Sequence, residues 1–246
     1  MQSKNTYIIG DVHGEYETLI KLINKIPKNS KIIFVGDLVD RGLKSKDVIK
    51  FIRDNKYKCV LGNHEEFMIS FAKSLKKDYA NIARSNSFYT WITKGGKQTL
   101  LSYGLIKIDN DDGRLYYIDD EKKLQEFYDD VEWLKTLPLY IKIEDIKKHN
   151  KEIVISHASI ANIWETIKNK NKQDILNENI LWSRKEPKED VEIFNIFGHT
   201  VVKEVNTEKH FIDVDTGCHY LEKGFGKLSA YCLQTDEVIS VKKDRS

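Results

Sequence analysis

Cysteine and proline are scarce in this chain, with three of each among 246 residues. The cysteines, Cys59, Cys218 and Cys232, form an odd set without the spacing of metal ligands. Free thiols in a reducing compartment account for them better than a disulfide framework does. No apolar run approaches the ~20 residues that a membrane span needs, and residues 1–5 offer no apolar signal region. We therefore expect a soluble, cytoplasmic protein that has no membrane partner.

The chain also lacks an excess of charge of either sign. The net charge is +2, and lysine is interspersed with aspartate and glutamate along the whole chain. Nothing in this pattern calls for a nucleic-acid partner. The apolar content of 40% permits a sizeable core. Because no repeat, low-complexity tract or proline-rich linker divides the chain, we expect a single domain over residues 1–246.

Three short glycine-flanked motifs are the most informative feature that is present. They read Gly-Asp-Val-His-Gly (10–14), Gly-Asp-Leu-Val-Asp-Arg-Gly (36–42) and Gly-Asn-His-Glu (62–65). Within them Asp11, Asp37 and Asn63 follow one another at intervals of 26 residues, and each motif comes directly after a short apolar run. This spacing is typical of repeated strand–helix units.

In the first third of the chain, short strand-like apolar runs alternate with segments whose apolar residues recur at helical spacing. Predicted strands at 6–9, 31–35 and 59–61 are followed by apolar residues at helical spacing, at 19–26, 45–52 and 67–71. Such alternation favours a sheet with parallel strands. Ligands of such sheets lie beyond the carboxyl ends of the strands, which is where all three motifs fall.

The rest of the chain divides into two regions. Residues from about 78 to 151 predict a largely helical insertion, with an amphipathic helix at 124–137 that stops before Pro138. Strands then return at 153–155, 193–197, 211–214 and 228–233. This second half is expected to be a set of adjacent strands rather than a strict alternation with helices. His157 and His199 follow the first two of these strands.

The residue types at the strand ends suit divalent metals. Asp11 and His13 are two residues apart and can reach one cation, and the carboxylate of Asp37 can bridge two cations. Asn63 adds a neutral oxygen, and His157 and His199 add imidazole nitrogens. A mixed oxygen and nitrogen set without thiolates suits Mn²⁺, iron or Zn²⁺. Two such metals would acidify a shared water and clamp phosphoryl oxygens.

Each of these signals is weak by itself. An isolated Gly-Asp is usually a turn, and an isolated histidine is more often packed or on the surface than a ligand. Four of the seven histidines and six of the thirteen glycines nevertheless fall at predicted strand ends, when His157 and the Gly-His-Thr at 198–200 are counted with the three motifs. The remaining histidines have no such context, and we interpret them as ordinary residues: His149, His210 and His219.

Taken together, the motifs resemble the phosphoprotein phosphatase branch of the calcineurin-like metallophosphoesterases. The resemblance runs from Gly10 to about Leu233 and is strongest to the compact bacterial and bacteriophage serine/threonine phosphatases. Trp91, Thr99 and the Asp-Thr-Gly at 215–217 also resemble that subgroup. The resemblance implies an α/β fold, a two-sheet β-sandwich flanked by helices, with a dinuclear metal centre at one edge.

The resemblance also implies roles for individual residues. One metal would be held by Asp11, His13 and Asp37, and the other by Asp37, Asn63, His157 and His199. His64 would protonate the leaving group, and Asp40 would orient His64. Arg41 and Arg184, the latter within a Trp-Ser-Arg match, would bind the phosphate.

The expected function is metal-dependent hydrolysis of phosphate monoesters by a metal-bridging hydroxide. The main expectation is a serine/threonine protein phosphatase that uses two divalent metals, with Mn²⁺ as the expected metal and a phosphoprotein or a small phosphorylated molecule as substrate. Leu61 precedes Gly62 where many protein phosphatases carry arginine and dinucleoside-polyphosphate hydrolases often carry leucine. A dinucleoside tetraphosphate hydrolase is therefore the alternative. A catalytically silent binding module is less consistent with the complete ligand set.

Overall fold

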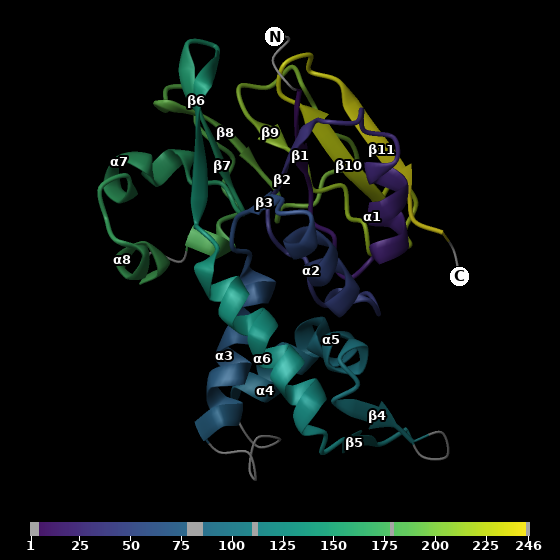
Figure 1. Ribbon diagram of the computed structural model, residues 1–246. Helices are drawn as coiled ribbons and strands as arrows, with labels where there is room; N and C mark the ends of the chain where they lie inside the picture. The colour runs from purple at the N-terminus through teal and green to yellow at the C-terminus, as the bar shows by residue number, and fades with distance from the viewer. Residues whose placement is uncertain (1–4, 78–85, 110–112, 178–179, 245–246) are drawn as a thin grey trace.

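Two β-sheets packed face to face form the body of the protein (Figure 1). The computed structural model describes residues 5–77, 86–109, 113–177 and 180–244. One sheet has five strands in the order β11-β10-β1-β2-β3, and the other has four in the order β6-β7-β8-β9. The predicted two-sheet sandwich flanked by helices is therefore confirmed.

The five-stranded sheet contains the first predicted strands. Its members are β1 (Thr6–Ile9), β2 (Lys31–Phe34), β3 (Lys58–Cys59), β10 (Lys227–Cys232) and β11 (Val238–Lys242). The first three are parallel, as the sequence predicts, whereas β10 pairs antiparallel with both β1 and β11. The parallel strands point their carboxyl ends toward the same edge, and this edge carries all three glycine-flanked motifs.

The four-stranded sheet supplies the remaining donors. It consists of β6 (Tyr140–Lys148), β7 (Lys151–Ser156), β8 (Ile193–Phe197) and β9 (Ile212–Asp213). The first two strands are antiparallel, and β7, β8 and β9 are parallel. Because β6 belongs to this sheet, the predicted insertion does not reach residue 151. Residues 140–148 are a sheet strand whose polar, partly exposed sequence hides its strand character.

Side chains alternate between the two faces of each central strand and so form two separate apolar layers. Ile8, Ile33 and Ile155 point between the sheets into the inner cluster. Their neighbours Tyr7 and Val154 point to the outer faces, where helices cover them. Period-two alternation thus gives each central strand two buried faces.

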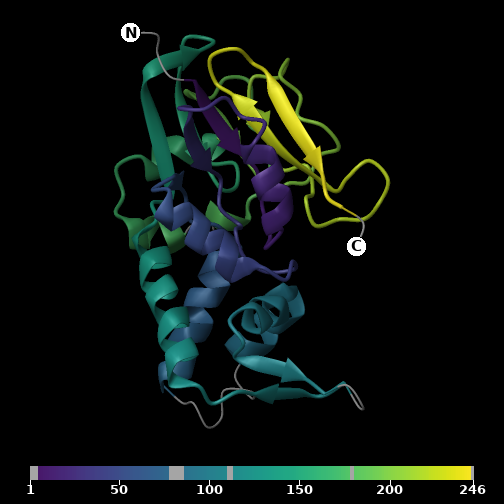
Figure 2. The ribbon, with the colours of Figure 1, turned by 45° about the vertical axis from the view of Figure 1, so that its right-hand side comes forward.

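Helices cover the outer face of each sheet (Figures 1 and 2). α1 (Tyr16–Ile23) and α2 (Ser45–Asp54) cover the five-stranded sheet. Between β7 and β8 the chain forms η3 (Ala161–Ile163), α7 (Trp164–Ile167), α8 (Lys172–Asn177) and η4 (Ile180–Trp182). The strands of this half are adjacent and do not alternate strictly with helices, as predicted, but the short helices between β7 and β8 were not predicted. These helices have at most six residues, too few to show a helical periodicity.

A helical lobe extends from one end of the sandwich (Figure 1). α3 (Asn63–Lys77) leads into it, and α4 (Asn86–Trp91), η2 (Ile92–Gly96), α5 (Lys97–Ser102), β4 (Ile106–Ile108), β5 (Leu115–Tyr117) and α6 (Glu121–Thr136) follow. We call residues 86–136 the helical lobe. It is largely helical, as predicted, and adds the hairpin β4–β5. Residues 78–85, where the predicted insertion begins, lie outside the described residues. Within the described residues, no helix combines the length and the apolar character needed to cross a membrane.

Candidate metal centre

The predicted donors converge at one edge of the sandwich. Asp11 and His13 follow β1, Asp37 follows β2, and Asn63 begins α3 just after β3. From the second sheet, His157 follows β7 and His199 follows β8. All six side chains are buried, with at most 6% of any residue exposed. Residues that are almost 190 positions apart thus meet because parallel strands end at the same edge.

The loops that carry these donors have an unusual backbone. His13, Asp37 and His199 have φ angles of 48°, 48° and 67°. The neighbouring Asp40 and Arg41 have φ angles of 74° and 69°. This left-handed conformation is uncommon for residues other than glycine, and strain of this kind concentrates at functional sites.

Asp37 lies at the centre of the donor set. Its carboxylate oxygens are 3.6 Å from Nε2 of His13 and 3.4 Å from Nε2 of His157. Two groups of potential ligand atoms share this residue, one containing His13 and His64 and the other containing His157 and His199. A carboxylate placed between two such groups is suited to bridging two cations.

The imidazole orientations fit bound cations. Nδ1 of His157 lies 2.9 Å from the carbonyl of Val35, so that Nδ1 carries the proton and Nε2 keeps its lone pair. That Nε2 lies 2.7 Å from Asn63 Oδ1 and also faces the Asp37 carboxylate. These three groups all offer lone pairs to one another, and a cation between them would stabilise the arrangement. Burial lowers the pKa of His157, which favours this neutral form. Nδ1 of His13 is held in the same way by the carbonyl of Val39, at 2.9 Å.

His199 provides the clearest sign of a missing partner. Its Nε2 is buried and has no hydrogen-bond partner, which is the case for three side-chain atoms in the described residues. A buried polar atom without a partner is costly. Burial lowers the pKa of His199 to about 3, so the ring is neutral and its lone pair is free for a cation. The residues present therefore fit a metal.

The acidic side of the centre supports the same conclusion. Burial and the carboxylates of Asp215 and Asp37 raise the pKa of Asp11. The backbone N–H of His199 donates to Asp11 at 3.2 Å. Glycine is required at Gly198, because a Cβ there would lie 2.2 Å from Asp11 Oδ1. Several buried carboxylates in one place need compensating positive charge, which divalent cations would supply.

Glu65 fixes the loop that carries Asp37, a role that sequence reasoning missed. The Glu65 carboxylate accepts the backbone N–H groups of Asp37 and Leu38, both at 2.8 Å, and that of Gly62 at 2.9 Å. It thereby ties the second motif to the third. Glu65 stands within a motif, but its contacts depend on the tertiary structure and have no signature in sequence.

His64 and Asp40 form a buried pair. Nδ1 of His64 is 2.6 Å from Asp40 Oδ2, and the same carboxylate accepts from Trp91 Nε1 at 2.9 Å and Thr99 Oγ1 at 2.7 Å. Burial alone would lower the pKa of His64, but the carboxylates of Asp37 and Asp40 outweigh it and the pKa is raised. The imidazole is therefore oriented and favoured in the protonated form that a general acid needs.

Arg41 and Arg184 lie on two sides of the centre. Arg41 Nη2 is 3.1 Å from His64 Nε2, and Arg41 Nη1 is 3.0 Å from His13 Nε2. Arg184 Nη1 donates to the carbonyl of His199 at 3.2 Å. Both guanidinium groups thus lie beside predicted ligands, and their binding of a phosphate, which the resemblance implies, stays a prediction.

His219 also belongs to the site, contrary to the interpretation of it as an ordinary histidine. Its Nε2 is 2.9 Å from Arg41 Nη1, and its ring centroid is 4.7 Å from that of His13. A loop after β9 delivers it, and no glycine-flanked motif marks the position. Only the tertiary structure brings it to Arg41.

Comparison with known proteins agrees with this geometry. Residues 4–203 match the model of a family described as calcineurin-like phosphoesterase. The chain belongs to this family. The matched range contains every predicted donor and both arginines, and the resemblance seen in the motifs is thereby confirmed.

Among calcineurin-like phosphoesterases, several curated relatives match part of the chain. A symmetrical bis(5'-nucleosyl)-tetraphosphatase of Buchnera aphidicola is 30% identical over 65% of this chain and 46% of its own length. A zinc-dependent endopolyphosphatase of Saccharomyces cerevisiae is 32% identical over 46% of this chain and 36% of its own length. The chain thus spans less than half the length of these relatives.

Solved structures share the fold over nearly the whole chain. A putative diadenosine tetraphosphatase superimposes with a TM-score of 0.61 and 18% identity, covering 100% of this chain and 96% of its own. A cold-active protein-tyrosine phosphatase of a psychrophilic Shewanella gives a TM-score of 0.55 and 20% identity, covering 98% of this chain and 78% of its own. At these identities the likeness establishes the fold alone.

Proposed function

We propose that the protein is a dimetal phosphoesterase that hydrolyses dinucleoside tetraphosphates. The observation that carries the hydrolytic part of this proposal is the pair of ligand groups that share Asp37, with His64 and Arg41 beside them. This arrangement supports the binding of a phosphoryl group and the protonation of its leaving group.

The metal ligands are assigned from geometry and proton positions. His64 lies near enough to Asp37 to be counted with His13 as a potential ligand. Its Nδ1, however, is bonded to Asp40 and its Nε2 faces Arg41, so we assign it to proton transfer. One cation would then be held by Asp11, His13 and Asp37, and the other by Asp37, Asn63, His157 and His199. When bound, the cations would supply Lewis acidity and a water of lowered pKa. Mn²⁺ is our first candidate, and Zn²⁺ is the second because one relative is named as zinc-dependent.

The side chains of the protein then divide the remaining work. Arg41 and Arg184 bind the phosphoryl oxygens, where planar guanidinium groups pair with two oxygens at once. The proton on Nε2 of His64 passes to the leaving oxygen, while Asp40 holds the Nδ1–H and stabilises the charged ring. Trp91 and Thr99 hold Asp40 in place.

The choice of dinucleoside tetraphosphates over the expected phosphoproteins is supported by the relatives. The Buchnera relative is named for that reaction, and the solved structure with a TM-score of 0.61 bears a similar name. Leu61 points in the same direction, because it is 2% exposed within the apolar cluster and adds no positive charge to the site. The leaving group would be a nucleoside diphosphate.

A serine/threonine phosphatase activity is the second candidate. The Asp-Arg-Gly at 40–42 and the Asn-His-Glu at 63–65 favour it, as does the buried His64–Asp40 pair. An alkoxide leaving group requires protonation, which this pair can provide. That the protein works in the cytoplasm without nucleic acid or membrane stays a prediction.

The test is a parallel assay of the Mn²⁺-loaded protein on diadenosine tetraphosphate, a phosphoserine peptide and p-nitrophenyl phosphate. We expect diadenosine tetraphosphate to be cleaved with the highest kcat/KM and to yield two molecules of ADP. A higher kcat/KM on the phosphopeptide would replace the first candidate with the second. Inactivity on all three substrates would reject both and favour a binding module.

A further inference from the structure

Arg41, one of the two proposed phosphate ligands, faces three imidazole rings. Its Nη1 lies 3.0 Å from Nε2 of His13 and 2.9 Å from Nε2 of His219. Its Nη2 lies 3.1 Å from Nε2 of His64. A guanidinium group has donors and no acceptor. Each of these contacts is therefore a hydrogen bond only while the imidazole nitrogen offers its lone pair to Arg41.

Two of the three rings have another task in the proposed reaction. Nε2 of His13 would turn its lone pair to a cation, because its Nδ1 is occupied by a backbone carbonyl. Nε2 of His64 would carry the proton for the leaving group, because its Nδ1 is bonded to Asp40. His219 has neither task. Of the three rings, it is the one that can accept from Arg41 throughout the reaction.

The loop that carries His219 fixes the position of this ring. Asp215 Oδ1 accepts the backbone N–H of Gly217 at 2.9 Å. The carbonyl of Gly217 accepts the backbone N–H groups of Tyr220 and Gly226 at 2.9 and 3.0 Å. The Tyr220 ring packs on the half-buried His219, with centroids 4.1 Å apart. The imidazole is thus held in place before any ligand binds.

The backbone of Arg41 is held from the opposite side, by the helical lobe. Its N–H donates to the carbonyl of Gly95 at 3.1 Å, and its φ angle is 69°. This contact fixes the main chain but not the long side chain, which has many rotamers to lose when it is ordered. The guanidinium end needs an acceptor of its own, and His219 supplies one.

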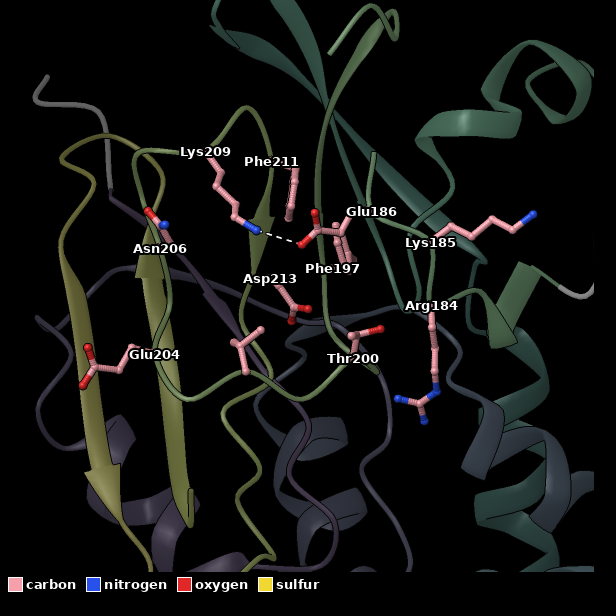
Figure 3. Close-up of a pocket in the computed structure, with 11 residues that line it drawn as sticks. Arg184, Lys185, Glu186, Phe197, Thr200, Glu204, Asn206, Lys209, Phe211 and Asp213 are labelled. Atoms are coloured by element: carbon pink, nitrogen blue, oxygen red, sulfur yellow. Dashed lines mark hydrogen bonds and ion pairs between the residues drawn. The ribbon is translucent and has the colours of Figure 1, made fainter. Parts of the chain in front are cut away.

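The other proposed phosphate ligand has an anchor of a similar kind. Nη1 of Arg184 donates to the carbonyl of His199 at 3.2 Å. Figure 3 shows the Arg184 guanidinium directed away from the ion pair of Lys209 and Glu186. A backbone carbonyl remains an acceptor whether or not metals or protons are bound nearby. The two arginines thus have anchors of different origin, one from the main chain and one from a side chain.

We propose that His219 is a positioning residue, which accepts from Nη1 of Arg41 and holds the guanidinium toward the phosphate. The remaining N–H groups of Arg41 stay available to phosphoryl oxygens. Because the guanidinium is oriented in advance, less rotamer freedom is lost when the phosphate binds. The inference rests on the hydrolytic part of the proposed function and holds for either candidate substrate.

The test is calorimetric binding of inorganic phosphate to the Mn²⁺-loaded protein, with the metal content measured by elemental analysis. His219→Phe keeps an aromatic ring but removes both nitrogens, and it should weaken phosphate binding roughly tenfold without loss of metal. His219→Gln restores an acceptor and should return the affinity to within about threefold of the wild type. His210→Phe is the matched control, because this half-buried histidine instead contacts the carbonyl of Pro187 and should not affect phosphate binding.

A double-mutant cycle tests whether His219 acts through Arg41. In an Arg41→Ala background, His219→Phe should weaken phosphate binding by less than about twofold. With p-nitrophenyl phosphate, His219→Phe alone should raise KM about tenfold and change kcat less than about threefold. A contact that is present both in the substrate complex and in the transition state acts on KM in this way.

Several outcomes would overturn the inference. They are unchanged phosphate affinity in His219→Phe, an equal loss when Arg41 is absent, no recovery in His219→Gln, and a wild-type protein that binds no phosphate. Loss of metal from His219→Phe would also overturn it, since the ring would then support His13 instead. Should His219→Phe fail to fold, as judged by circular dichroism, His219→Ala takes its place.

The binding assay requires no turnover and so separates this inference from the proposed function. Phosphate affinity that depends on His219, in a protein that cleaves none of the assayed substrates, would keep the inference and reject the proposed reaction. Cleavage of diadenosine tetraphosphate by a protein whose phosphate affinity is independent of His219 would do the reverse.

Discussion

The sandwich edge and the helical lobe contribute to the site in different ways. The edge supplies all six proposed metal ligands from loops that directly follow strands, or from the first residue of α3. The described part of the lobe supplies none of them. Its Trp91 and Thr99 instead hold Asp40, and the carbonyl of Gly95 accepts the backbone N–H of Arg41 at 3.1 Å.

This difference indicates a division of tasks. Cation binding would depend on the ligands that follow the parallel strands, and it should survive changes in the lobe that leave those strands and ligands intact. Asp40, which orients the proposed general acid, and Arg41 are held by lobe residues that lie 50 or more positions further along the sequence. Substitutions at the edge should therefore abolish activity together with metal binding, whereas substitutions in the lobe should weaken activity and leave the metals bound.

The largest effect is expected for Asp37→Asn. Replacing the shared carboxylate by an amide removes the group that both ligand sets have in common, so activity on p-nitrophenyl phosphate should be lost. Asp54→Asn, at an exposed carboxylate paired with Lys50, is the control and should be fully active. Wild-type turnover by the Asp37 variant after metal depletion would contradict the proposed centre.

His64→Asn should have the second-largest effect. Loss of the general acid should slow hydrolysis of an alkyl phosphate by about 10²–10⁴-fold. Aryl phosphates should be affected less, because their leaving groups need less protonation. The metal content, measured by elemental analysis, should stay at the wild-type value. Equal losses on both kinds of substrate would reject His64 as the acid.

Trp91→Phe tests the contribution of the lobe. It removes the indole N–H that donates to Asp40, and a hydrogen bond to a charged group contributes about 1.5–3 kcal/mol. We expect kcat to fall roughly tenfold with unchanged metal content. Trp133→Phe, in α6 of the same lobe and without contact to Asp40, should keep wild-type kcat. Loss of the metals in the Trp91 variant would contradict the division of tasks.

The smallest effect on catalysis is expected for Tyr103→Phe. The Tyr103 hydroxyl donates to Asp130 at 2.6 Å inside the lobe, away from the site. Its loss should lower the free energy of unfolding by about 1–3 kcal/mol, measured by urea titration, with no change in kcat. Tyr89→Phe is the control, since Tyr89 is 72% exposed. A kcat loss as large as that of Trp91→Phe would show that the lobe acts on the site as a whole.

The donors at the strand ends were predictable because strand, glycine and ligand lie within a few residues of one another. His157 and His199 were found in the same way. His219 and Glu65 were not, since their roles come from contacts across the fold that local spacing does not encode. The polar strand β6 and the short helices α7 and α8 were missed because their apolar residues clearly show neither the two-residue period of a strand nor the period of a helix.

Two divalent cations are proposed to bind at the residues around Asp37. The most direct measurement is the calorimetric titration of the metal-free protein with Mn²⁺, which reports stoichiometry without any substrate. We expect two equivalents per wild-type chain and fewer than two for Asp37→Asn. A wild-type chain that binds one equivalent or none, or an Asp37 variant that still binds two as tightly, would contradict the account.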